Sequence, residues 1–217
     1  MAYKRNQIEL ALSGLLERNA SAPSSQLRTQ VKRLLNTDRS LGRSTRSKDP
    51  AKLNYAFYNE DPPGSGVEIL FSEYECLALL NGLQLMRHGW SQTFAVSVLR
   101  HVRPELEKEH ARILKLDKVT LFDEEAIRRN AKAGAVAFSN NDPVLLTIVS
   151  AYGQSIEQQD LPVACAVHRG INAAYNWVMK VTKGKGGGSS MFDQTGIAHA
   201  LAEQLEQTEP QRRGRKS

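Results

Sequence analysis

The feature that most constrains the fold is a helix whose start and end signals both stand between Ser72 and Gly89. Ser72 followed by Glu75 forms a capping box, in which each side chain accepts a hydrogen bond from the other residue's backbone amide. Apolar residues then recur at helical spacing, and Gly89 follows Arg87 and His88, as expected where a helix closes with cations in its last turn. The pattern therefore predicts a helix between these two signals.

Two further helices are predicted after a very short connection. Ser91 can cap the first of them, which is expected to end before Pro104, because proline lacks the amide proton that would continue the helix. Pro104 suits the first position of a third helix. That helix would carry on one side Leu106, His110, Ile113 and Leu114. Helices joined by so short a turn cross steeply, as in helix-turn-helix units.

Upstream of the capped helix, two β-prone runs flank a segment rich in turn residues. Residues 53–58 alternate in character, and residues 67–71 form a second apolar run. The segment between them contains Asp-Pro-Pro-Gly-Ser-Gly, which favours a reversal of the chain. The sequence thus predicts a β-hairpin whose tip lies at residues 64–66.

The order of hairpin, capped helix, glycine turn and second helix resembles the wing and following helix pair of MerR-type winged-helix regulators over residues 53–114. The positions that carry this resemblance are Tyr74, Leu77, Leu80, Leu83, Met86, Gly89, Trp90, Phe94 and Leu99. The resemblance implies a DNA-binding fold. The chain lacks the Thr-Leu-Arg-Tyr-Tyr-like run and the long coiled-coil helix of that family, so the expectation is a winged helix in the broad sense.

Two amphipathic helices are predicted before the hairpin. The first spans residues 4–18 on an apolar stripe at helical spacing, and a loop at residues 19–25 follows it. Ser24 or Ser25 can cap the second helix. Its inward positions would be Leu27, Val31, Leu34 and Leu35. Its outward face is basic, and the apolar periodicity fades in residues 36–50, which favours a loop there.

A concentration of positive charge begins on this second helix. The seven cations are Arg28, Lys32, Arg33, Arg39, Arg43, Arg46 and Lys48. Only one acid, Asp38, stands among them, and the surplus equals the net charge of +6 of the whole chain. Such a run is either a solvated surface loop or a phosphate-contacting surface. Its position beside a candidate recognition helix and wing favours nucleic acid.

The basic tail at residues 210–217 offers a second candidate contact. Arg213-Gly214-Arg215 resembles the centre of an AT-hook, although Lys216 stands where a hook has proline. Two alternatives remain, namely insertion of Arg213 and Arg215 into the minor groove and nonspecific attraction to phosphates.

Residues 117–209 have the mixed pattern of a small α+β domain. Asp123 can cap a short helix that runs to Asn130. The elements expected after it are a hairpin of 135–138 with 144–151, a strand at 163–167, a helix or strand at 171–181, a glycine-rich loop at 183–190, a strand at 191–192 and a final helix around 197–209.

No catalytic or metal-binding motif is recognisable. The lysine of the glycine-rich loop precedes the glycines and is not followed directly by Ser or Thr, so a flexible connection is favoured over a phosphate loop. The histidines form no zinc-binding pattern. Cys165 and His168 would face opposite sides of a strand, which disfavours a nucleophile and base pair. We expect no enzyme, no metal and no cofactor.

The two cysteines, Cys76 and Cys165, each stand in an apolar stretch and are expected to be buried free thiols. No run approaches the roughly 20 apolar residues of a membrane span, and no secretory signal is visible at the start. These features predict a cytoplasmic protein.

The sequence therefore predicts an α+β protein with a winged-helix-like domain at 1–116, an α+β dimerisation or sensing domain at 117–209 and a basic disordered tail at 210–217. The expected function is sequence-specific binding of double-stranded DNA by a homodimeric transcription regulator. The alternatives are a non-enzymatic adaptor built on the same fold and a nonspecific architectural or plasmid-maintenance DNA-binding protein. Any small-molecule effector is left open.

Overall fold

The computed structural model describes residues 1–18, 21–63, 67–131, 140, 142–151, 165–183 and 187–208. The chain divides into two compact units. The first unit comprises Met1–Arg100 with Ala200–Ser217, and the second comprises His101–His199. Two helices, α5 (Gln92–Ile113) and α10 (Gln194–Glu206), contribute to both.

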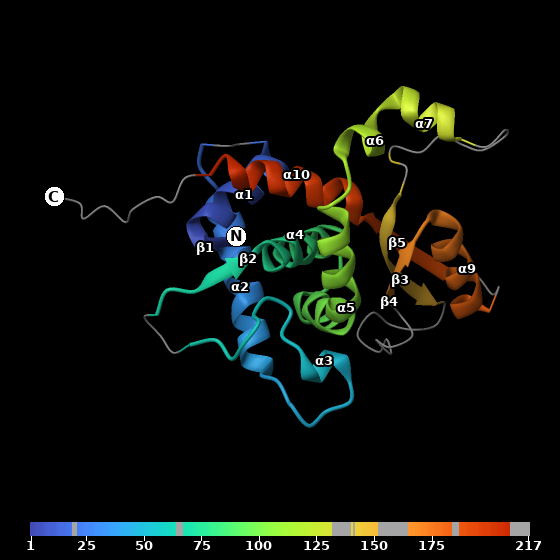
Figure 1. The fold of residues 1–217 in the computed structure, drawn as a ribbon. Helices are drawn as coiled ribbons and strands as arrows, with labels where there is room; N and C mark the ends of the chain where they lie inside the picture. Colours follow the sequence, from blue (N-terminus) through green and yellow to red (C-terminus); the bar gives the residue numbers. More distant parts are fainter. Residues whose placement is uncertain are drawn as a thin grey trace. The chain divides into compact units, whose positions relative to one another are not determined.

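The first unit is mainly helical (Figure 1). Its elements in chain order are β1 (Ala2–Lys4), α1 (Arg5–Glu17), α2 (Ser25–Leu41), α3 (Pro50–Leu53), β2 (Leu70–Ser72) and α4 (Glu73–Arg87), followed by the start of α5 and joined by the end of α10. α2 packs against both α1 and α4. The side chains buried between them include Ile8, Leu12, Leu34, Leu77 and Leu80. This apolar core fixes the orientation of α2.

α4 begins and ends where the sequence predicts. Ser72 Oγ accepts from the Glu75 amide at 3.2 Å, and the Glu75 carboxylate accepts from the Ser72 amide at 2.7 Å. The helix ends at Arg87, and Gly89 then adopts a φ of +87°, which glycine tolerates best. The predicted Ser91 cap is also present, because its Oγ accepts from the Phe94 amide at 3.2 Å.

The predicted break at Pro104 is wrong. α5 runs without interruption from Gln92 to Ile113 and carries Pro104 inside it. A proline inside a helix removes one backbone hydrogen bond, and its ring crowds the carbonyl of the preceding turn, at a cost of about 3 kcal/mol. Val102 is buried before Pro104, and Leu106 and Ile113 are buried after it. Burial on both sides of the proline therefore offsets its cost.

The predicted β-hairpin is wrong for the residues that the structure describes, and its tip at 64–66 lies outside them. Residues 54–58 form no strand, because the amides of Ala56 and Phe57 donate to the Asp38 carboxylate. Only the end of the second run is extended, as β2, which pairs antiparallel with β1. The small sheet of the first unit therefore consists of β2 and the first strand of the chain, β1.

The second unit is built on a three-stranded antiparallel sheet (Figure 1). β3 (Val144–Ala151) lies at the centre, between β4 (Cys165–Arg169) and β5 (Gly187–Asp193). The remaining elements are α6 (Lys118–Phe122), α7 (Glu124–Asn130) and α9 (Ile171–Thr182), with parts of α5 and α10. α9 packs on β3 and β4, and the Trp177 ring lies 5.1 Å from that of His168.

Several predictions for this region are confirmed. Asp123 caps α7 by accepting from the Ala126 amide at 2.7 Å, and residues 144–151 form a strand. Of the helix and strand left open for residues 171–181, the structure shows the helix, at 171–182. The glycine-rich loop is wrong in part, because β5 begins at Gly187. The predicted strand at 135–138 lies outside the described residues, as do positions 184–186.

The structure confirms the mixed α+β class. The two compact units divide within α5 and again within α10. The predicted domain boundary after residue 116 stays a prediction.

Candidate nucleic-acid interface

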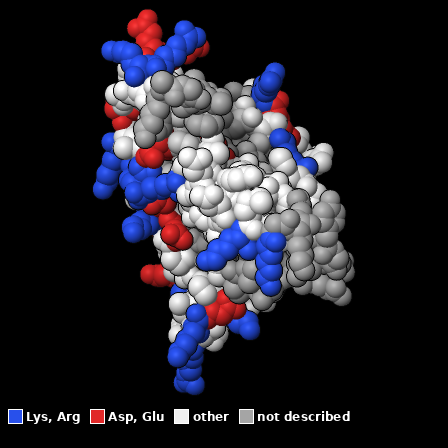
Figure 2. All heavy atoms as spheres, turned by 90° about the vertical axis from the view of Figure 1, so that its right-hand side faces the viewer, with Lys and Arg blue, Asp and Glu red and all other residues white. Residues whose placement is uncertain are grey.

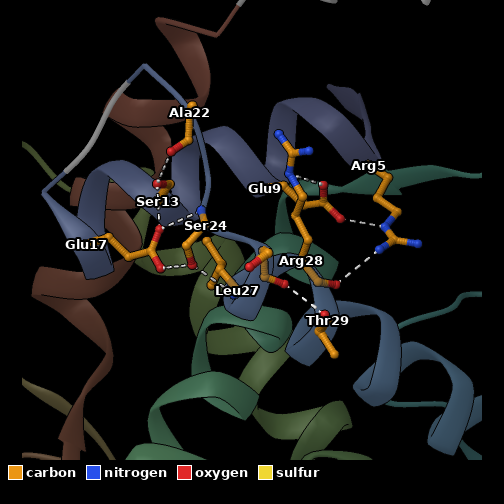
Figure 3. Close-up of polar contacts among 10 residues, drawn as sticks. Arg5, Glu9, Ser13, Glu17, Ala22, Ser24, Leu27, Arg28 and Thr29 are labelled. Carbon is orange, nitrogen blue, oxygen red and sulfur yellow. Dashed lines mark hydrogen bonds and ion pairs between the residues drawn. The ribbon is translucent and has the colours of Figure 1, made fainter.

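α2 begins at a set of hydrogen bonds that tie it to the end of α1. Ser24 Oγ accepts from the Leu27 amide at 3.1 Å and donates to the Glu17 carboxylate (Figure 3). Glu17 also accepts from the Ser24 amide at 3.1 Å and from Ser13 at 2.9 Å. These hydrogen bonds, that from the Ser24 hydroxyl above all, lower the pKa of the Glu17 carboxyl. The start of the basic helix is therefore held in place by a charged acceptor.

α2 is longer than the sequence predicts, because residues 36–41 continue the helix. Its buried stripe consists of Leu27, Val31, Leu34, Leu35 and Asp38. Asp38 occupies the next inward position after the leucines, which is why the apolar periodicity fades there although the helix does not. The stripe fixes which side chains face solvent.

Asp38 is fully buried and forms an ion pair with Arg100 of α5, which is also buried. The Arg100 Nε donates to Asp38 Oδ1 at 2.6 Å, and the Arg100 Nη2 donates to the Asp38 carbonyl at 2.5 Å. Burial raises the pKa of the Asp38 carboxyl, and Arg100 opposes that rise. The pair joins α2 to α5 within the first unit.

The same guanidinium also positions the chain after α2. Arg100 Nη1 donates to the Gly42 carbonyl at 2.6 Å, and the Arg100 guanidinium lies 5.2 Å from the centre of the Tyr55 ring. Arg43 lies 5.6 Å from the same ring and pairs with Asp61 at 2.9 Å. The segment after α2 is thus anchored to the core, and it carries Arg46 and Lys48 in exposed positions.

The seven predicted cations of residues 28–48 are all exposed. Arg28 is near Glu9, at 4.0 Å, and Arg43 is paired with Asp61. Within the part of the chain that the structure describes, no ion pair engages the other five, which are Lys32, Arg33, Arg39, Arg46 and Lys48. We call α2 with residues 42–48 the basic surface. Its charge is available to an anionic partner.

The basic surface continues into a neighbouring cleft that the sequence analysis missed. Lys4 and Arg5, at the start of α1, line this cleft together with Arg28 and Arg39 of α2. Their contribution could not be recognised in the sequence, because the antiparallel pairing of β1 with β2 brings the start of the chain to this place. Arg213 and Arg215, the predicted tail contacts, lie outside the described residues.

Basic and acidic residues are interspersed on the face drawn in Figure 2, where much of the described surface carries no charge. Arg112 and Arg169 of the second unit both pair with Glu109, at 2.8 and 2.6 Å. Cations of this unit are thus partly engaged within it, whereas several in the basic surface are not.

Two features bear on other chemistry. Cys76 and Cys165 are buried and free, as predicted. Burial raises the pKa of both thiols, that of Cys165 to about 12, which leaves little thiolate at neutral pH.

Among the described residues, His, Cys, Asp and Glu side chains form no group of three that could hold a metal. No helix in those residues combines the length and apolar character that crossing a membrane requires.

Comparisons of the chain with protein-family models, curated proteins and solved structures found no match.

Proposed function

We propose that the protein is a DNA-binding transcription regulator that uses the basic surface to contact double-stranded DNA. One observation carries the proposal. The basic surface exposes seven cations, while the one acid among them, Asp38, is turned into the core and paired with Arg100. Folding therefore exposes the cations of this segment and hides its single carboxylate, as a phosphate-binding surface requires.

In this proposal α2 supplies the recognition face. Lys32 and Arg33 are exposed on its middle turns and would approach the major groove, where a guanidinium can bind guanine with two hydrogen bonds. Arg39, Arg46 and Lys48 would hold phosphates. The C-terminal arginines Arg213 and Arg215 would add phosphate or minor-groove contacts.

The proposal keeps the two N-terminal helices of a winged-helix-like domain but does not use a wing built from residues 53–71. We place the protein in the cytoplasm and assign it no enzymatic activity. A homodimer is expected, because one short recognition helix reads few base pairs and twofold symmetry doubles the site. The second unit would then serve dimerisation or sensing.

The test is selection of bound duplexes from a random pool, followed by fluorescence anisotropy on the selected sequence at several salt concentrations. Arg33→Ala should weaken specific binding by about 1–3 kcal/mol if Arg33 reads a base. Lys48→Ala should weaken all duplexes alike and reduce the slope of log K against log salt by about 1. Arg128→Ala, which removes an exposed arginine of α7, is the matched control and should change neither quantity.

The outcomes separate the candidate functions. A recovered palindrome would support the homodimeric regulator, and its half-site spacing would give the dimer geometry. Binding with a strong salt dependence but no enriched sequence would point to a nonspecific architectural protein. Failure to bind any duplex at low salt would refute the proposal and favour an adaptor with an acidic protein partner.

A further inference from the structure

A cleft of about 980 Å³ lies within the first unit, beside the proposed contacts to DNA. It is bounded by the start of α1, one side of α2, Tyr58 and the segment of residues 67–71. The volume is at the upper end of the range found for small-molecule sites, roughly 300–1,000 Å³.

The cleft has an apolar floor. Leu35, Tyr58 and Phe71 line it, and each is at most 6% exposed. The Tyr58 hydroxyl donates to the Leu35 carbonyl at 3.3 Å, and the Tyr58 and Phe71 rings lie 6.1 Å apart. Burial raises the pKa of Tyr58 to about 12, so this floor carries no charge at neutral pH.

The walls of the cleft carry a surplus of positive charge. Four cations line it, against the two carboxylates of Glu9 and Glu68. Glu9 lies between two arginines, Arg5 at 2.7 Å and Arg28 at 4.0 Å (Figure 3). Lys4 pairs with Glu68 at 3.0 Å. Two positive charges in the cleft are therefore not balanced by a carboxylate. One belongs to Arg39, which has no ion pair within the described residues, and the other arises because Arg5 and Arg28 share the single carboxylate of Glu9.

We infer that the cleft binds a small organic anion with an apolar body, such as an acyl or aryl carboxylate. The anionic group would lie beside Arg39, and the apolar body would lie against Val67 and Ile69 of the cleft wall. Burial of that body supplies the affinity that exposed ion pairs alone do not. A DNA backbone fits the cleft less well, because its phosphates would satisfy the cations and leave the exposed side chain of Val67 in water.

Arg28 and Arg39 belong both to the cleft and to the basic surface, so the bound anion should compete with DNA. This second step rests on the proposed function, whereas binding of the anion does not. The protein would then release DNA when the anion accumulates. Such competition requires only that the anion and DNA contact the same cationic side chains.

The probe is anilinonaphthalene sulfonate, an aryl anion whose fluorescence rises in an apolar site. The full-length protein should bind it saturably. Arg39→Ala and Val67→Asp change exposed residues that line the cleft, and each should raise the dissociation constant roughly fivefold. Lys32→Ala removes a cation of α2 that does not line the cleft and should leave the probe affinity unchanged while weakening DNA binding. Arg128→Ala is the control for total charge.

Competition then identifies the ligand class. Sodium decanoate should displace the probe, and inorganic phosphate at the same concentration should not. Equal displacement by phosphate, or displacement by a duplex but not by decanoate, would overturn the inference. An unchanged dissociation constant of the probe in both Arg39→Ala and Val67→Asp would also overturn the inference. If decanoate displaces the probe but no duplex binds at all, the cleft assignment stands and the proposed DNA-binding function fails.

Discussion

Replacement of Asp38 by Asn tests the element that connects the fold to the basic surface. The side chain keeps its size but loses its charge, so the Arg100 guanidinium, only 4% exposed, is left without a counter-ion. The Asp38 carboxylate accepts hydrogen bonds from the backbone amides of Ala56, at 3.1 Å, and Phe57, at 2.9 Å. In the variant, the asparagine side chain offers these amides one carbonyl oxygen and one NH2 group. At least one buried donor loses its acceptor.

The expected cost follows from that geometry. Removing one partner of a buried ion pair destabilises a protein by roughly 3–5 kcal/mol, because the remaining charge stays buried and unpaired. Total stabilities are about 5–15 kcal/mol. Asp38→Asn should therefore remove a large share of the stability of the first unit.

Urea unfolding provides the measurement. Trp90 packs against Phe94 with ring centres 4.8 Å apart, so its fluorescence in a Trp177→Phe background reports on the first unit. Asp61→Asn makes the same chemical change at the pair with Arg43, where the Asp61 side chain is 72% exposed. That control should cost less than about 1 kcal/mol.

A cost of Asp38→Asn equal to that of Asp61→Asn would refute the reasoning. The double variant Asp38→Asn with Arg100→Met extends the test, because removal of both charges relieves the unpaired guanidinium. The double variant should recover part of the stability lost by Asp38→Asn alone. Additive costs would show that the two charges do not interact.

Two further predictions concern packing and acid stability. Hydrogen bonds from Arg169, followed by those from Arg112, lower the pKa of the Glu109 carboxyl below its usual value of 4.5. The stability this carboxylate contributes is complete above that value and is lost as the pH falls through the lower folded pKa, so Glu109→Gln should flatten the fall of melting temperature in that acid range. An unchanged pH profile would contradict this. A Cβ atom at Gly82 of α4 would lie 3.1 Å from Leu34, so Gly82→Val should lower the free energy of unfolding by about 1–3 kcal/mol, measured in urea. Gly188→Val, where a Cβ meets nothing within 4 Å, should not.

Helix starts were predictable because their signals are local. The caps formed by Ser24, Ser72 and Asp123 each join residues three positions apart, so the sequence contains both partners in one window. The end of α4 was predictable for the same reason, because Gly89, with its positive φ, stands directly after the last turn. These helix starts and this helix end depended only on neighbouring residues, and the structure confirms them.

Features that depend on distant partners were missed for a physical reason. The β1 and β2 strands have only three residues each, and their partners, such as Tyr3 and Phe71, stand far apart in the chain. No alternating pattern can be recognised in so short a segment. The continuity of α5 through Pro104 likewise depends on buried neighbours rather than on the helix itself.

The basic surface combines both situations. Asp38 stands three residues after Leu35, at the position where the inward stripe of α2 continues, so the sequence contained a sign that it faces the core. Its partner, Arg100, is 62 positions away, and nothing local identifies it. A charge count along the sequence subtracts Asp38 from the seven cations, but the structure neutralises this acid from inside with an arginine outside the segment. The exposed surface is therefore more positive than the sequence count indicates, which strengthens the case for an anionic partner.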